Sequence, residues 1–229
     1  MNLMLVIDTS RRPFNIVLGQ GRACLFDSLA SSAMADKSDL SAMVEEALRQ
    51  SGRTIDEIGA VAVNIGPGAL GSVRSGVSFA NALGYGLGVP VYPVTSFELM
   101  GYVAAEQHRC PVLCTARASN GYAYVGVYTQ GHLSFLGFGL IEEVAAAAID
   151  GIERAAIAGD HRSTLCEILA SRDVMDSGIE RSVAATFLEL ATCSDRASKS
   201  FPEVAIPITE ESELLLEPPE IPSSAKESS

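Results

Sequence analysis

The stretch Ala60–Leu87, AVAVNIGPGALGSVRSGVSFANALGYGL, predicts a buried strand, a tight turn and a long helix in direct succession. β-Branched residues alternate with smaller ones as far as Ile65, as in a strand, and Gly66-Pro67-Gly68 ends the run. We expect a type II turn there, because Pro67 presets φ for its second position and Gly68 can take the positive φ of its third. A helix can then begin at once.

The helix predicted over Ser72–Gly86 has small residues at every fourth position, which gives one of its faces low relief. Another helix could approach that face closely. Two interpretations stay open, namely packing inside this chain and an interface with another subunit. The small residues are Gly76, Ala80 and Gly84.

Composition narrows the class of protein. The chain has 229 residues, of which 48% are apolar and 6% aromatic, so it can form one large or two small domains with aliphatic cores. Its net charge of −12 argues against direct binding of this chain to nucleic acid, RNA included, because phosphate contacts need clustered Lys and Arg. No apolar run reaches the ~20 residues of a membrane span, so we expect a cytoplasmic protein without membrane contact. Five scattered cysteines indicate reduced thiols rather than a disulfide frame or a zinc site.

The N-terminal residues predict a meander of three strands followed by a helix with an apolar face. The strands are expected at Leu3–Ile7, Phe14–Leu18 and Ala23–Ser28, and the helix over Ser38–Gln50, with Gly52 as its C-cap. Together with the opening stretch, this gives the order βββαβα. We assign residues 1–95 to this N-terminal lobe.

Residues 96–207 predict a smaller α/β lobe that resembles a degenerate copy of the first. Thr95 and Glu98 have the spacing of a capping box, and Asn120-Gly121 is a hairpin signal between two strands. Strands are expected at 112–116, 123–128, 133–138 and 155–158, and helices at 96–106, 141–149 and 183–193. Residues 208–229 contain six Glu and one Lys, which predicts a disordered acidic tail.

Several motifs carry a family resemblance. Asp8-Thr9-Ser10 after the first strand resembles the first phosphate motif of the actin, sugar kinase and Hsp70 (ASKHA) superfamily. More narrowly, the chain resembles the TsaB (YeaZ) family of bacterial proteins that serve tRNA threonylcarbamoyladenosine synthesis. The matching features are the I-D-T-S opening, the Met-Val-Glu-Glu-x-Leu centre of the first helix, and the GPG-xxxx-x-R-x-G pattern from Gly66 to Gly76.

The chain also departs from the family pattern. Ala69-Leu70-Gly71-Ser72 replaces the usual Ser-Phe-Thr-Gly, so two hydroxyls of that loop are missing. Arg117-Ala118-Ser119 stands where the family commonly has Asp-Ala-Arg, and the C-terminal Pro-x-Tyr-x-Arg is absent.

The resemblance implies a two-lobed ASKHA fold and a noncatalytic role. TsaB proteins pair with TsaD, the threonylcarbamoyltransferase, and the assembly recruits the ATPase TsaE; a homodimer is expected when the partner is absent. ATP and magnesium would then belong to the partners, and this chain would need no cofactor. The family pairs through its first two helices, which places the interface here at Leu40, Met43, Val44, Ala47, Val73, Gly76, Val77 and Ala80.

The residues themselves give little sign of catalysis or metal binding. The three histidines, His108, His132 and His161, lack the spacing of a helical metal pair, so the His-x-x-x-His of TsaD is missing. The glycine turn lacks the Gly-Lys-Ser/Thr ending of a P-loop, although helix starts attract anions. We therefore expect at most a vestigial phosphate or anion site, at Asp8, Thr9, Gly66, Gly68 and Arg74.

Two alternative functions stay open at this stage. A small ATP-dependent kinase or acyltransferase of the superfamily would use Asp8 and the loop from Gly66 to Arg74 on phosphate. A diverged paralogue with a different partner would account for the lost loop hydroxyls.

Overall fold

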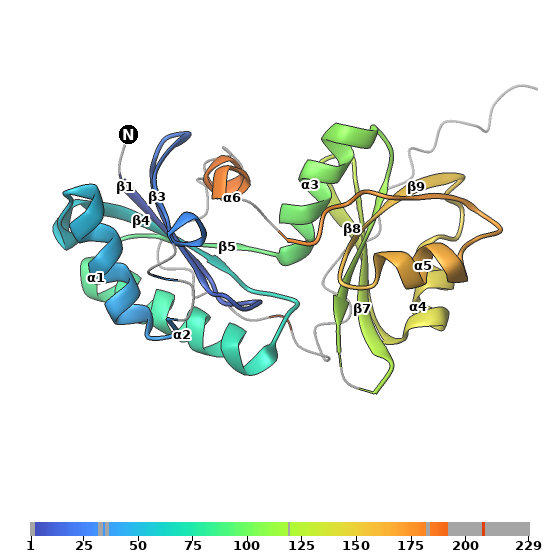
Figure 1. Ribbon diagram of the computed structural model, residues 1–229, viewed down its shortest axis with the longest axis horizontal. Coiled ribbons are helices and arrows are strands. Elements are labelled where there is room, and N and C mark those ends of the chain that lie inside the picture. The colour runs from blue at the N-terminus through green and yellow to red at the C-terminus, as the bar shows by residue number, and fades with distance from the viewer. Residues whose placement is uncertain are drawn as a thin grey trace, which may run out of the picture.

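The computed structural model describes residues 3–31, 34, 37–118, 120–181, 184–191 and 208. The chain forms two five-stranded sheets side by side, each with helices against it (Figure 1). The strand order is β3-β2-β1-β4-β5 in the first sheet and β10-β9-β6-β7-β8 in the second.

The elements follow one another in the same way in both halves. The first half contains β1 (Leu3–Asp8), β2 (Asn15–Gln20), β3 (Ala23–Asp27), η1 (Ser28–Ala30), α1 (Leu40–Ser51), η3 (Ile55–Glu57), β4 (Ile58–Asn64), α2 (Leu70–Leu87), β5 (Val91–Val94) and α3 (Ser96–His108). The second half contains β6 (Val112–Arg117), β7 (Tyr122–Thr129), β8 (His132–Leu140), α4 (Ile141–Ala148), β9 (Arg154–Gly159), α5 (Arg162–Ile168), β10 (Asp173–Asp176) and α6 (Ala184–Ala191).

The two sheets share one topology. In each, three strands form an antiparallel meander, and two later strands then add parallel to the first strand of the meander. This repetition confirms the predicted two-lobed ASKHA-type α/β fold, with βββαβα at the start and a second lobe built as a copy. The chosen division into residues 1–95, 96–207 and 208–229 stays a prediction.

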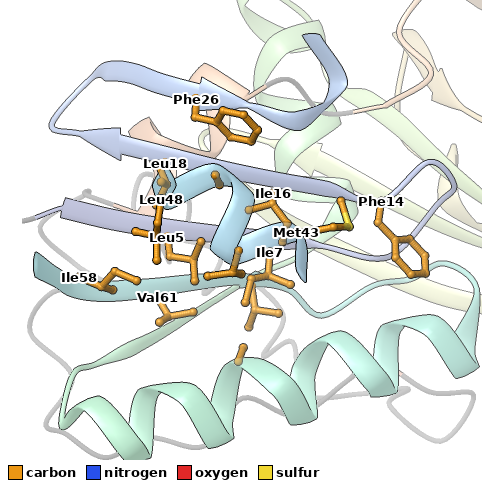
Figure 2. Packing of buried hydrophobic residues seen from close by; sticks show 14 of the residues in the cluster. Leu5, Ile7, Phe14, Ile16, Leu18, Phe26, Met43, Leu48, Ile58 and Val61 are labelled. Carbon is orange, nitrogen blue, oxygen red and sulfur yellow. The ribbon is translucent and has the colours of Figure 1, made fainter. Parts of the chain in front are cut away.

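The central strand β1 is buried along its whole length because helices cover both faces of its sheet. Leu5 and Ile7 lie on the face covered by α1 and α2, in one cluster with Met43 of α1 and Val61 of the neighbouring strand β4 (Figure 2). Met4 and Val6, in the alternate positions, point to the opposite face and pack with residues of α6. Each fully buried side chain of this size contributes about 1.5–3 kcal/mol, which is why a continuous apolar run stands here instead of an alternating one.

The last helix of each half covers the sheet of the other half. Helix α3 packs on the second sheet through Phe97, Met100 and Ala104. Helix α6 returns to the first sheet, where Phe187 and Leu188 join the face formed by Met4 and Val6 (Figure 1). The outer face of the second sheet is covered by α4 and α5. Because α3 packs on the second sheet and α6 packs on the first, these two helices hold the two lobes together.

Most local predictions from the sequence are confirmed. Gly52 ends α1 with a φ of 65°, and the capping box of Thr95 and Glu98 opens α3. Asn120 and Gly121 both have positive φ in the hairpin between β6 and β7. Three short elements, β5, α5 and β10, were not predicted from the sequence.

One prediction, at the glycine turn, needs correction. The type II turn is wrong, because the positive φ lies at Gly66 (96°) and the Gly66–Pro67 peptide is cis. Ile208, the first residue of the predicted tail, donates its N–H to the Ile65 carbonyl at 2.7 Å. The other residues of the tail, and the end of the helix predicted to reach residue 193, lie outside the described residues. Within the described part of the chain, no helix combines the length and the apolar character that crossing a membrane requires.

Candidate functional site

The carboxyl ends of β1 and β4 bring Asp8 and Asn64 together. The two strands are parallel and paired as far as Ile7 and Val63, so the next residue of each strand lies at the same edge of the sheet. Asp8 is 3% exposed, and its Oδ1 accepts hydrogen bonds from the Ser10 N–H (2.9 Å), the Ser10 hydroxyl (2.6 Å) and the Asn64 amide (3.1 Å). One carboxylate oxygen is therefore held by three donors.

Asn64 extends this network to the start of α3. Its Oδ1 accepts from the Gly66 N–H at 2.8 Å and from the Ser96 hydroxyl at 3.0 Å. The Ser96 N–H in turn donates to the Gly66 carbonyl at 2.8 Å. Because buried polar groups must be paired, these bonds fix the positions of the three segments that follow β1, β4 and β5.

The glycine turn packs directly against the segment after β1. A side chain at Gly68 would collide with the Ser10 backbone, and the Ala69 N–H donates to the Ser10 carbonyl at 2.9 Å. Only glycine permits this close approach at position 68. The turn thus forms one wall beside Asp8.

The second lobe supplies the facing wall at the ends of β6 and β9. Asp160 accepts a hydrogen bond from the Arg117 N–H at 2.9 Å, and its own N–H donates to the Thr115 carbonyl at 3.1 Å. Thr115 is 1% exposed, and its hydroxyl has no hydrogen-bond partner among the described residues. The guanidinium of Arg117 is exposed and likewise has no partner in the described part of the chain.

A cleft of about 710 Å³ lies between these walls. Its lining combines four arginines, three carboxylates, small polar groups and several apolar side chains. The residues that line it are Asp8, Ser10, Arg11, Arg12, Asn64, Pro67, Gly68, Ala69, Leu70, Ser96, Met100, Thr115, Ala116, Arg117, Ala118, Tyr124, Asp160, Glu180 and Arg181.

Arginines of both lobes bridge the cleft. Arg11 forms an ion pair with Asp160 at 3.1 Å and donates to the Glu180 carbonyl at 3.1 Å. Arg181 donates to the Pro13 carbonyl at 3.2 Å, so the bonds run in both directions between the lobes. Arg12 lies over the Phe14 ring at 4.7 Å. The cleft thus contains four guanidinium groups, although the chain as a whole has a net charge of −12.

The predicted anion site is only partly assembled. Asp8 and Gly68 line the cleft, whereas Thr9, Gly66 and Arg74 do not. Thr9 is fully buried and its hydroxyl donates to the Ser72 carbonyl at 2.7 Å, which joins β1 to α2. Arg74 lies on the exposed side of α2.

The predicted pairing residues of α1 and α2 face the sheet. Leu40 is half-buried against the core of the first lobe, and the other seven residues are buried. This placement corrects the residue list: those seven residues are buried within the first lobe and are not available to a partner. The pairing role of the two helices is not tested by it. The surface of α1 carries Ser41, Glu45 and Arg49, and that of α2 carries Arg74, Ser75, Ser78 and Tyr85.

Among the described residues, no three His, Cys, Asp or Glu side chains converge in a way that could hold a metal ion. Burial raises the pKa of the Cys114 thiol, and it also raises the pKa of Cys166, to which Asp176 adds. Neither thiol is therefore activated as a nucleophile.

A family model with the description "TsaD: tRNA N6-adenosine threonylcarbamoyltransferase" matches residues 32–221. The chain belongs to this family. Curated TsaD-family relatives described as tRNA N6-adenosine threonylcarbamoyltransferases include one from Clostridium perfringens, 34% identical over 122 residues, and one from Desulfitobacterium hafniense, 32% identical over 120 residues. These matches cover 51% and 50% of this chain but 35% and 34% of the relatives, so the chain matches about a third of their length.

Solved structures show the same fold over nearly the whole chain. A Pseudomonas aeruginosa protein described as similar to the peptidase YeaZ superposes with a TM-score of 0.70 at 23% identity, over 91% of this chain and 99% of its own. A second structure, YeaZ from the same organism, gives a TM-score of 0.63 at 23% identity, over 83% and 91%. The expected resemblance to YeaZ proteins within the TsaD family is thus confirmed.

Sequence reasoning missed most of the cleft. Asn64 could have been found, because a polar residue ends an otherwise apolar buried strand. Arg117, Asp160 and Arg181 carry no such signal, since they line a cleft only because the second lobe packs beside the first.

Proposed function

We propose that this chain is a noncatalytic subunit that pairs with a TsaD-type transferase in threonylcarbamoyl modification of the adenosine beside the tRNA anticodon. One observation carries the proposal. The chain belongs to the TsaD family, matches about a third of the length of the curated transferases, and superposes on 99% of a YeaZ-like chain.

The sequence supports a noncatalytic role for this chain. Its three histidines stand at positions 108, 132 and 161, so no His-x-x-x-His pair is present to bind the metal of a transferase. In this proposal ATP and magnesium belong to the TsaD-type and TsaE-type partners. A net charge of −12 fits a subunit that acts on tRNA through its partner rather than by its own contact.

The outer faces of α1 and α2 are the proposed pairing surface. Their apolar sides are already used against the sheet, so the partner meets the exposed residues. Among these exposed residues is Tyr85, a large aromatic side chain near the end of α2, with 86% of its surface exposed. Aromatic side chains of this kind supply much of the energy of protein interfaces. The same surface would form the homodimer when the partner is absent.

Light scattering on a sizing column tests this proposal. We expect the chain alone to run as a dimer, and a mixture with the TsaD-type protein of the same genome to give a 1:1 complex. Reconstitution with a TsaE-type ATPase and tRNA should then give threonylcarbamoyladenosine only when this chain is present. Failure to form the complex over a range of concentrations, with and without nucleotide, contradicts the proposal.

One observation favours a second candidate, an ATP-dependent kinase or acyltransferase. Asp8 lines a cleft between two lobes, where it could approach a bound phosphate. Calorimetry with ATP and magnesium separates the two candidates. Micromolar binding with turnover that Asp8→Asn abolishes would support the enzyme, whereas the partner-subunit proposal expects no turnover by this chain alone.

A further inference from the structure

Three arginines that line the cleft have hydrogen-bond donors that no residue of this chain uses. The guanidinium of Arg117 has no partner among the described residues, and that of Arg12 contacts only the ring of Phe14. Arg181 donates to the Pro13 carbonyl, but its Nε–H is buried and has no acceptor in the described part of the chain. A buried donor without an acceptor is rare in folded proteins, because it has lost its bond to water without gaining another. These donors are therefore available to a ligand.

The carboxylates of the cleft are already bound to other groups. Asp160 pairs with Arg11 at 3.1 Å, and Glu180 pairs with Arg162 at 3.2 Å. Asp8 accepts hydrogen bonds from donors of its own lobe. Four arginines line the cleft against three carboxylates, so the lining has a surplus of positive charge. Guanidinium groups that exceed their partners in a concave site favour an anionic ligand.

One contact between the lobes brings the three arginines together. Arg11 binds Asp160 and the Glu180 carbonyl, each at 3.1 Å. The arginines with unused donors are the chain neighbour of Arg11, the chain neighbour of Glu180, and the residue whose N–H donates to Asp160 at 2.9 Å, namely Arg12, Arg181 and Arg117. Their backbones are thus held in place before a ligand binds, which lowers the entropic cost of binding.

The rest of the lining indicates the size and character of the ligand. The cleft has a volume of about 710 Å³, within the range of roughly 300–1,000 Å³ that is typical of sites for small organic molecules. Met100, Ala116 and Tyr124 add apolar surface to its lining. A ligand with an organic body and acidic groups would use both parts of this surface.

We propose that the cleft binds a small organic anion that carries two or more carboxylate or phosphate groups. The acidic groups bind Arg12 on one side of the cleft and Arg117 and Arg181 on the other, and the organic body lies against Met100 and Tyr124. Arginines supply the positive charge, so binding requires no metal ion. This inference does not depend on pairing with a TsaD-type protein, because every group that it uses belongs to this chain.

NMR of the arginine side chains in the full-length protein tests the inference. The ¹⁵N-labelled chain is titrated with citrate and, separately, with fructose 1,6-bisphosphate, in buffers freed of metal ions and held at constant ionic strength. We expect the Nε–H signal of Arg181 to shift and to saturate. The Nε–H of Arg162 donates to Asp176 at 2.7 Å, so its signal should stay in place and serves as the control. The two titrations distinguish a preference for carboxylate from one for phosphate. No saturable shift of Arg181 with either compound below roughly 10 mM would overturn the proposal.

Inorganic phosphate tests whether two acidic groups are needed. It carries one such group, so we expect its dissociation constant to be at least about tenfold higher than that of the better of the two organic anions. An equal affinity would overturn the proposal, because the cleft would then bind small anions without regard to their structure.

Charge variants supply a second test by calorimetry. Arg117→Gln should raise the dissociation constant of the organic anion about tenfold, because a charge-assisted hydrogen bond is lost. Arg74→Gln removes the same charge from α2, outside the cleft, and should leave the dissociation constant unchanged. Both arginines are exposed, so neither change should impair folding. Equal affinities in the two variants would overturn the proposal. Binding that requires ATP with magnesium and is lost in Asp8→Asn would overturn it in favour of the kinase candidate.

Discussion

Arg11 and Asp160 are joined across the cleft, with Nη1 of the arginine 3.1 Å from Oδ1 of the aspartate. Arg11 follows β1, the first strand of the first sheet, and Asp160 follows β9, the fourth strand of the second. The pair therefore connects the two copies of one topology at their functional edge. Its side chains are 41% and 24% exposed, so water and salt weaken the pair.

Arg11→Ala should loosen the lobes without unfolding them. The loss of a half-exposed ion pair costs at most about 1 kcal/mol, so the urea midpoint should change little. Amide hydrogen exchange at residues 115–118 and 66–70 should become faster, because the two walls of the cleft separate more often. Arg49→Ala breaks an ion pair within α1 and should leave exchange at the cleft unchanged. Equal exchange in both variants would mean that Arg11 does not hold the lobes.

Gly76→Ala should destabilise the first lobe. A methyl group at position 76 would collide with the side chain of Thr9, which is itself fixed by its bond to Ser72. Overpacking of this kind costs about 1–3 kcal/mol, measured as a shift of the urea unfolding midpoint. The cost should fall on a Thr9→Ala background, since the two residues then no longer conflict. Gly86→Ala, on the same helix with open space around it, should be neutral or stabilising.

This collision shows what the sequence could and could not predict. The spacing of Gly76 and Ala80 correctly indicated a face for close packing, because residues four positions apart lie on the same face of a helix. It could not say whether the neighbour is another helix of a partner or a strand of the same chain. The neighbour is Thr9, the residue directly after β1, so the face packs inside the lobe.

The fold was predictable to a greater depth than the site. Buried strands such as β1 and capped helices such as α1 and α3 are specified locally, by apolar runs and by Asp39 and Thr95. The cleft is built from residues as distant in sequence as Arg11 and Glu180, and no local pattern records that they meet. The strand β10 was not predicted because it has only four residues, all of them half-buried or exposed, and so shows no apolar run.

Asp176 should make stability depend on pH. Burial opposes its charge, but hydrogen bonds from the Gly178 N–H and from Arg162 outweigh burial and lower its pKa below the ordinary 3.8. A lowered pKa in the folded state gives stability that is present above about pH 4 and is lost as the pH falls through the folded-state pKa. Asp176→Asn should therefore lower the free energy of unfolding at pH 6, by about 1 kcal/mol or less, and the difference from the unmodified chain should shrink towards pH 3.

The urea midpoint of both proteins at pH 6 and pH 3 checks this expectation. Asp173→Asn, in the same strand, is the control, because its contact with Arg154 is longer at 3.8 Å and both side chains are exposed. A difference between Asp176→Asn and the unmodified chain that grows on acidification would have the wrong sign for a lowered pKa.

Tyr85→Ala should weaken pairing with a TsaD-type protein, provided that the outer face of α2 is the pairing surface. The side chain is 86% exposed, so its removal leaves no cavity and should not lower the stability of the chain. At the centre of an interface, loss of a tyrosine raises the dissociation constant about tenfold or more. Titration calorimetry with the partner measures this change, and light scattering shows whether the homodimer weakens in parallel. Tyr122→Ala removes a 41% exposed tyrosine from β7 of the other lobe and should leave both associations unchanged. If Tyr85→Ala pairs as tightly as Tyr122→Ala, the partner meets a surface other than α2, and the pairing helices inferred from the family would have to be abandoned for this chain.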